Sequence, residues 1–118
     1  MASHHILGRK GEEMAVKFLR EKGYNILHTN WKQGRKEIDI IARQAGTLVF
    51  VEVKTRSGQA FGMPEEAVNG VKESHIRYVA ENYLERFRPT IEALRFDIVS
   101  ITFSAGNPME IIHFEDVF

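Results

Sequence analysis

The chain has 118 residues, of which 43% are hydrophobic and 27% are charged, and its formal net charge is zero. These values are typical of a soluble globular protein with one hydrophobic core. Cysteine is absent and the five histidines are scattered, which excludes disulfides and thiolate zinc sites. No stretch approaches the ~18 apolar residues of a membrane span, and the first residues lack the apolar run of a signal peptide. We therefore expect a cytoplasmic protein without membrane contact.

The charges are unevenly distributed along the chain. Residues 1–36 contain eight Lys/Arg and three Asp/Glu, whereas the remainder contains eight Lys/Arg and thirteen Asp/Glu. A basic N-terminal third is compatible with a phosphate-binding face, and equally with two solvated faces of opposite sign. Charge alone does not separate these two interpretations.

The predicted elements alternate between helical and extended patterns. Helical spacing of apolar residues predicts a helix over 8–23, ended by Gly23, and aromatic and branched residues predict a strand over 24–31. Two more strands, 37–43 and 47–56, flank a tight turn. A loop over 57–64 leads to a helical pattern over 65–87, which Gly70 could divide in two, and strands 94–103 and 109–114 follow. The order α-β-β-β-α-β-β predicts one α/β or α+β domain over residues 1–118.

Charged side chains interrupt the apolar residues of the central hairpin, EIDIIARQAGTLVFVEVKTR. Because side chains alternate along a strand, Phe50, Glu52 and Lys54 should share one face, opposite the three valines Val49, Val51 and Val53. The same rule places Glu37 and Asp39 together, opposite Ile38 and Ile40. A two-residue turn at Ala45-Gly46 then sets Asp39 across from Glu52, and Glu37 across from Lys54.

This polar cluster has two interpretations. The first is a solvent-facing stripe with a cross-strand Glu-Lys pair, which is the commoner case for an arbitrary hairpin. The second is a cation site, because Asp39 opposite Glu52 brings like charges together on a sheet whose faces are expected to be covered by helices. Two carboxylates in such surroundings suit Mg²⁺ or another hard divalent cation.

The predicted helices add a glutamate and a lysine to the argument. Glu12 lies within the apolar stripe of the first helix, only ~20° from Leu19, while Glu13 points to the far side. Favourable interaction with the helix dipole would explain either acid, and so does not account for the placement of Glu12. Lys72 also lies toward the apolar side of its helix, although a lysine along the rim with its ammonium in water is an equally good interpretation.

Five stretches carry a resemblance that covers nearly the whole chain: GRKGEEMA, NWKQGRKEIDIIA, LVFVEVKTR, FGMPEEAV and RFDIVSI. Together they resemble the YraN-type family of uncharacterised bacterial proteins, which is similar to archaeal Holliday-junction resolvases of the PD-(D/E)XK nuclease superfamily. The resemblance implies a restriction-endonuclease-like core with a mixed central sheet flanked by helices. It also implies a metal-dependent nuclease acting on DNA, with branched or Holliday-junction-like substrates among the candidates.

The resemblance implies roles for individual residues. Asp39, Glu52 and Lys54 match the superfamily's D…E-x-K pattern, and Glu12 matches its first-helix glutamate. Mg²⁺ or Mn²⁺ would be held by Asp39 and Glu52, with the Val53 carbonyl as a third ligand and Glu12 contacting the ion directly or through water.

Four basic residues, Arg9, Arg35, Arg56 and Lys72, are candidates for substrate binding. The expected partner is nucleic acid, with DNA favoured over RNA, and a homodimer is an open option. A non-catalytic nucleic-acid-binding or recruitment module on the same fold is the alternative. A structural partner-binding domain ranks third.

Overall fold

The computed structural model describes residues 4–57, 70–105 and 107–118 of the chain. The described residues form the helices α1 (His4–Glu21) and α2 (Gly70–Phe87) and the strands β1 (Asn25–Gln33), β2 (Lys36–Gln44), β3 (Thr47–Ser57), β4 (Ala93–Ser104) and β5 (Asn107–Phe114). Their order confirms the predicted α-β-β-β-α-β-β succession and the mixed α+β class. The helix predicted over 65–87 is described from Gly70 onward, so a division at that glycine and most of the loop predicted over 57–64 lie outside the described residues.

The five described strands form one mixed sheet in the order β1-β2-β3-β4-β5. Neighbouring strands are antiparallel except β3 and β4, which run parallel. Parallel neighbours need a crossover connection, and α2 lies on the connection between them. This arrangement places β3 at the centre of the sheet, between the hairpin partner β2 and the crossover partner β4.

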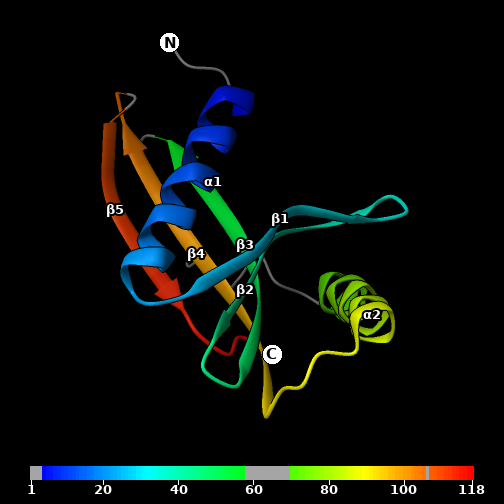
Figure 1. Cartoon of the computed structure of the whole chain (residues 1–118). Helices are drawn as coiled ribbons and strands as arrows, with labels where there is room; N and C mark the ends of the chain where they lie inside the picture. The colour runs from blue at the N-terminus through cyan, green and yellow to red at the C-terminus, as the bar shows by residue number, and fades with distance from the viewer. Residues whose placement is uncertain (1–3, 58–69, 106) are drawn as a thin grey trace.

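The two helices pack against opposite faces of the sheet (Figure 1). Ala15 and Leu19 of α1 pack with Val49 and Val51 of β3, and the half-buried Val53 joins the same cluster. On the other face, α2 packs against a cluster that contains Phe50. The predicted alternation along β3 is therefore confirmed.

A glycine in the left-handed conformation ends α1 at its C-terminus. Gly23 has a φ of +93°, which glycine adopts without steric cost, and the Tyr24 N–H donates to the Leu19 carbonyl across it. Gly23 thus ends the helix as predicted. Neither helix among the described residues combines the length and apolar character needed to cross a membrane.

Candidate functional site

The strands β2 and β3 part at Asp39. They pair from Gln44↔Thr47 to Ile40↔Val51, which confirms the predicted turn and register over that range. The pairing ends there, so the predicted direct pairings of Asp39 with Glu52 and of Glu37 with Lys54 are not formed. Instead, the Asp39 carboxylate (Oδ2) accepts a hydrogen bond from the Val53 N–H at 2.7 Å. A side-chain oxygen takes the place of a backbone acceptor at this point, and the ladder cannot continue through it.

The prediction that Ile38 and Ile40 share a face is wrong. Ile40 packs in the cluster that contains Leu19 of α1, whereas Ile38 packs in the cluster that contains Val79 of α2. Asn30, on the neighbouring strand, lies between the partners of these two isoleucines and has a φ of +51°. A left-handed residue interrupts the regular pleat, so strict alternation fails at Asp39, the residue between the two isoleucines.

Asp39 consequently borders pockets on both faces of the sheet. On the α1 face it lines a pocket of about 260 Å³ together with Arg9, Glu12 and Asn30. On the α2 face it lines a second, smaller pocket with Glu37, Ile38, Phe50, Val51, Glu52 and Ile76. The two predicted acids, Asp39 and Glu52, therefore share one pocket, and Glu12 approaches Asp39 from the other side.

On the α1 face, Glu12 is half-buried and Glu13 is exposed. Glu13 also lines the α1-face pocket, so the prediction that it points to the far side is wrong. With its amide nitrogen facing the acids, Asn30 donates to Glu12 Oε1 at 2.7 Å and to Glu37 Oε1 at 2.9 Å. One amide thus links two carboxylates from different elements. Its role was missed in the sequence, where the signal would have been that asparagine is enriched at left-handed positions.

On the α2 face, Glu52 is held between two lysines. Lys54 Nζ lies 3.2 Å from Glu52 Oε1, and the Lys72 ammonium of α2 contacts the same oxygen. The second carboxylate oxygen, Glu52 Oε2, is buried and has no hydrogen-bond partner in the described structure. The site therefore brings Lys54 and Lys72 to Glu52 and leaves one acidic oxygen unsatisfied.

The surroundings of the acids alter their protonation. Burial raises the pKa of Asp39 to about 6, with further increases from the negative charges of Glu12, Glu52 and Glu37, against the hydrogen bond from Val53. Burial and the charge of Glu37 likewise raise the pKa of Glu12. These directions are those of carboxylates crowded together with too little positive charge beside them.

The two lysines shift in opposite directions. Burial lowers the pKa of Lys54, and the neighbouring Lys72 lowers it further, against the attraction of Glu52. Burial alone would lower the pKa of Lys72 as well, but its hydrogen bond and charge interaction with Glu52 outweigh burial and raise that pKa. Lys72 is the more firmly protonated of the pair.

The four predicted substrate-binding residues are placed differently. Arg9 is exposed and lines the α1-face pocket, and Lys72 lies within the site. Arg35 is exposed at the end of the β1–β2 hairpin, and Arg56 is half-buried on β3, two residues beyond Lys54. The structure thus gathers two of the four beside the acids.

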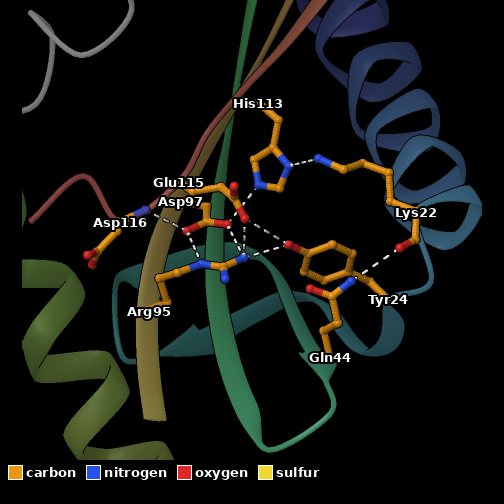
Figure 2. Close-up of polar contacts among 8 residues, drawn as sticks. All are labelled: Lys22, Tyr24, Gln44, Arg95, Asp97, His113, Glu115 and Asp116. Atoms are coloured by element: carbon orange, nitrogen blue, oxygen red, sulfur yellow. Dashed lines mark hydrogen bonds and ion pairs between the residues drawn. The ribbon is translucent and has the colours of Figure 1, made fainter.

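A second polar cluster, absent from the predicted site, lies at the lower end of α1 and along β4 and β5 (Figure 2). Asp97 is 2% exposed, and its carboxylate accepts from Arg95 Nε and Nη2, both at 2.9 Å, and from the Asp116 N–H at 3.0 Å. His113 Nε2 lies 2.7 Å from the same carboxylate, and its Nδ1 lies 2.6 Å from Lys22 Nζ. Arg95 also pairs with Glu115 at 3.0 Å.

Among the described residues, Asp97, His113 and Glu115 are the three metal-capable side chains whose ligand atoms all lie within 4.8 Å of one another. Glu12, Asp39 and Glu52 do not converge to that degree. However, each Asp97 oxygen already has two partners, and an ammonium donating to His113 Nδ1 leaves Nε2 as the nitrogen that donates to Asp97. This cluster is satisfied internally and connects α1, β4, β5 and the C-terminal residues.

This fold and site define a class of protein. It is a mixed α+β domain in which carboxylates and lysines gather where two central strands part. The chain belongs to the uncharacterised protein family UPF0102, whose family description matches residues 11–101. The predicted YraN-type membership is thereby confirmed.

Similar proteins come from several bacteria. The chain is 45% identical over 101 residues to a UPF0102 protein of Caldicellulosiruptor saccharolyticus, covering 86% of each chain. It is 41% identical over 118 residues to one of Phocaeicola vulgatus, covering 100% of this chain and 96% of the relative. A Nocardia farcinica relative is 44% identical over 112 residues, covering 95% and 88%. These names state a family and no activity.

Proposed function

We propose that the protein is a metal-dependent nuclease acting on DNA, with its centre where β2 and β3 part. The observation that supports this most directly is Glu52 Oε2, a buried carboxylate oxygen without a hydrogen-bond partner in the described structure. An unsatisfied buried acceptor costs stability, and charged acceptors cost most. A cation that binds this oxygen would remove the cost.

The donor set fits a hard divalent cation. Asp39 and Glu52 line one pocket and offer carboxylate oxygens, which Mg²⁺ and Mn²⁺ prefer. The raised pKa of Asp39 is also the shift that a bound cation would reverse. Asp39 and Glu52 would hold the metal, with the Val53 carbonyl and Glu12 as the further ligands that the nuclease resemblance implies.

Such an ion would supply Lewis acidity toward a phosphate oxygen and would lower the pKa of an attacking water. The chain's own residues contribute the rest. Lys54, which lies beside Glu52, would neutralise negative charge that builds on the phosphate. Arg9, which is exposed and lines the α1-face pocket, would hold the nucleic-acid backbone.

The resemblance supports the same reaction class. Asp39, Glu52 and Lys54 match the D…E-x-K pattern of the PD-(D/E)XK nucleases, and the central mixed sheet with a helix on each face suits a restriction-endonuclease-like core. Branched DNA, including junctions, is the substrate that the likeness to Holliday-junction resolvases favours. The chain would form a single nuclease domain.

The test is a cleavage screen with Mg²⁺ and with Mn²⁺ over labelled linear, flap and four-way-junction DNA. We expect cleavage by the parent and none by Glu52→Gln. The matched control is Glu21→Gln, which removes the same charge from an exposed position at the end of α1. Equal cleavage by the parent and Glu52→Gln would overturn the proposal.

A non-catalytic nucleic-acid-binding module is the second candidate function. The observation that favours it is that Lys54 and Lys72 already neutralise Glu52 from two sides. In that case DNA binding would persist in EDTA and in Glu52→Gln, and no metal would produce cleavage. The two functions therefore differ in the same set of assays.

A further inference from the structure

The hairpin of β1 and β2 extends beyond the body of the sheet. Its end lies away from α1 and from the other strands, on the side where α2 lies (Figure 1). The pairing continues to Gln33↔Lys36, and Gly34, with a φ of +65°, allows the tight turn between them. The end of the hairpin is therefore a paired two-stranded ribbon and not an irregular loop.

Positive charge is concentrated on this ribbon. The five residues of its end, Lys32–Lys36, read KQGRK and contain three cations and no acid. Lys32 and Arg35 are exposed. The first carboxylate along β2 is Glu37, which lines the pocket that Asp39 and Glu52 share. The basic end therefore adjoins the acidic site directly.

The ribbon is supported by aromatic packing on α2. Trp31 lies 5.3 Å from Tyr83 and 5.4 Å from Phe87, measured between ring centroids. Nearer the tip, Lys36 Nζ lies 4.9 Å from the centre of the Tyr78 ring, a cation–π contact. Packing of this kind holds the ribbon in one direction relative to α2 and so fixes where its charges point.

We propose that this basic ribbon binds the backbone of double-stranded nucleic acid and guides it to the acids. The inference rests on the proposed function and specifies its substrate class. A two-stranded β-ribbon is one of the two elements that the major groove of DNA admits, and lysines and arginines on it would contact phosphates. Proteins that prefer single strands present aromatic side chains for base stacking, and KQGRK contains none.

The experiment measures binding by fluorescence anisotropy in EDTA, so that it does not depend on cleavage. Lys32→Ala/Arg35→Ala, which we call the arm variant, removes two positive charges from the basic ribbon and leaves Lys36 on Tyr78. The matched control is Lys17→Ala/Arg20→Ala, which removes two exposed positive charges from α1. The probes are a fluorescent duplex DNA and a single strand of the same length, each titrated between about 50 and 200 mM salt.

We expect the arm variant to bind the duplex about tenfold more weakly, or weaker still, at low salt. The slope of log K against log [salt] should be less steep by about 2. The control should bind like the parent, and the parent should prefer the duplex to the single strand. Equal loss in both variants, no loss in the arm variant, parent preference for the single strand or absence of duplex binding would each overturn the inference.

The result is separable from that of the nuclease proposal. Loss of duplex binding in the arm variant without cleavage by the parent in any metal would support the ribbon and contradict the nuclease. Cleavage by the parent with an unchanged KM in the arm variant would do the reverse. Circular dichroism and thermal melts of both double variants establish that they are folded.

Discussion

The Asp39 carboxylate accepts a 2.7 Å hydrogen bond from the N–H of Val53, the residue that follows Glu52 on β3. This bond joins the strand that carries one acid to the strand that carries the other, at the point where their regular pairing has ended. The relative position of the two strands is therefore fixed by the protein's own hydrogen bonding. Preorganisation of this kind is what a metal-dependent centre needs from its protein.

The first prediction concerns Asp39→Asn and pH. Burial, together with neighbouring acids, raises the pKa of Asp39 to about 6, above its ordinary value of 3.8. A raised carboxyl pKa contributes stability that is fully present below the unfolded value and is lost as pH rises through the folded value. The asparagine can still accept from Val53 but carries no charge. We therefore expect the free energy of unfolding of the metal-free variant, relative to that of the parent, to rise by about 2 kcal/mol between pH 4 and pH 7.

Urea unfolding in EDTA at several pH values measures this difference, with Glu21→Gln as the control that should track the parent. A difference between Asp39→Asn and the parent that is the same at every pH would contradict the prediction. So would a loss of several kcal/mol at pH 7, which is the behaviour of a broken structural pair.

The second prediction distinguishes the role of the acids Asp39 and Glu52 from the role of Lys54. Asp39→Asn and Glu52→Gln should abolish Mn²⁺ binding, because each removes an anionic ligand. Lys54→Ala should retain Mn²⁺ binding within a few-fold and lower the cleavage rate by roughly 10² or more, because the lysine would act on the phosphate and not on the ion. Calorimetric titration with Mn²⁺ and single-turnover cleavage rates measure the two effects. Acid variants that bind Mn²⁺ like the parent would show that the cluster is architectural.

The sequence predicted the sheet and its central hairpin because the signals there are local. The Ala45-Gly46 turn set the register, and the alternation of Val49 and Val51 with Phe50 assigned the faces of β3. The same alternation placed Glu52 and Lys54 together. Such inferences depend only on a period of two and a turn length, both of which are written in the sequence.

The alternation of side chains failed as a predictor at Asp39, where the backbone departs from the geometry of a regular strand. The left-handed φ of Asn30 and the hydrogen bond that the Val53 N–H donates to the Asp39 carboxylate both interrupt the pleat, and no periodicity reveals either. The cluster around Asp97 was missed for a different reason. Lys22, Asp97 and His113 are distant in sequence and meet only because α1, β4 and β5 pack together.

The third prediction concerns Asn30, whose φ of +51° disfavours residues with a Cβ other than asparagine and aspartate. Asn30→Gly and Asn30→Ala both remove the amide that links Glu12 to Glu37. Only the alanine adds backbone strain, so we expect it to be less stable than the glycine by about 1 kcal/mol. At Thr29, which precedes it in the same strand with an ordinary φ, the order should invert, because glycine weakens a regular strand.

Chemical denaturation of the four variants measures both orders. The same order of glycine and alanine at Thr29 and at Asn30 would mean that the left-handed backbone at Asn30 is not a constraint on the folded protein. The Asn30→Gly variant also reports on the linking amide, because its loss should raise the pKa of Glu12, which Asn30 lowers by hydrogen bonding.

The last prediction concerns Asp97→Asn, and it should contrast with Asp39→Asn. Asp97 is 2% exposed and accepts from Arg95, and the side chain of its partner His113 is 3% exposed. Asparagine offers one acceptor oxygen where the carboxylate offers two, and its NH₂ would face donors. Without the Asp97 charge, Arg95 keeps only the half-exposed Glu115 as an ion-pair partner among the described residues, so we expect a loss of about 3 kcal/mol at pH 7.

The pH dependence should also have the opposite sign. Burial by itself would raise the pKa of Asp97, but hydrogen bonds from His113, Arg95 and the Asp116 N–H outweigh burial and lower it. A lowered carboxyl pKa contributes stability above the unfolded value that is lost as pH falls through the folded value. The deficit of Asp97→Asn should therefore shrink as the pH falls below about 4. Glu110→Gln, an exposed acid on β5, is the control. Urea unfolding across this pH range measures the deficit. A deficit that is constant with pH, or no deficit at pH 7, would mean that the charge of Asp97 does not hold α1, β4 and β5 together.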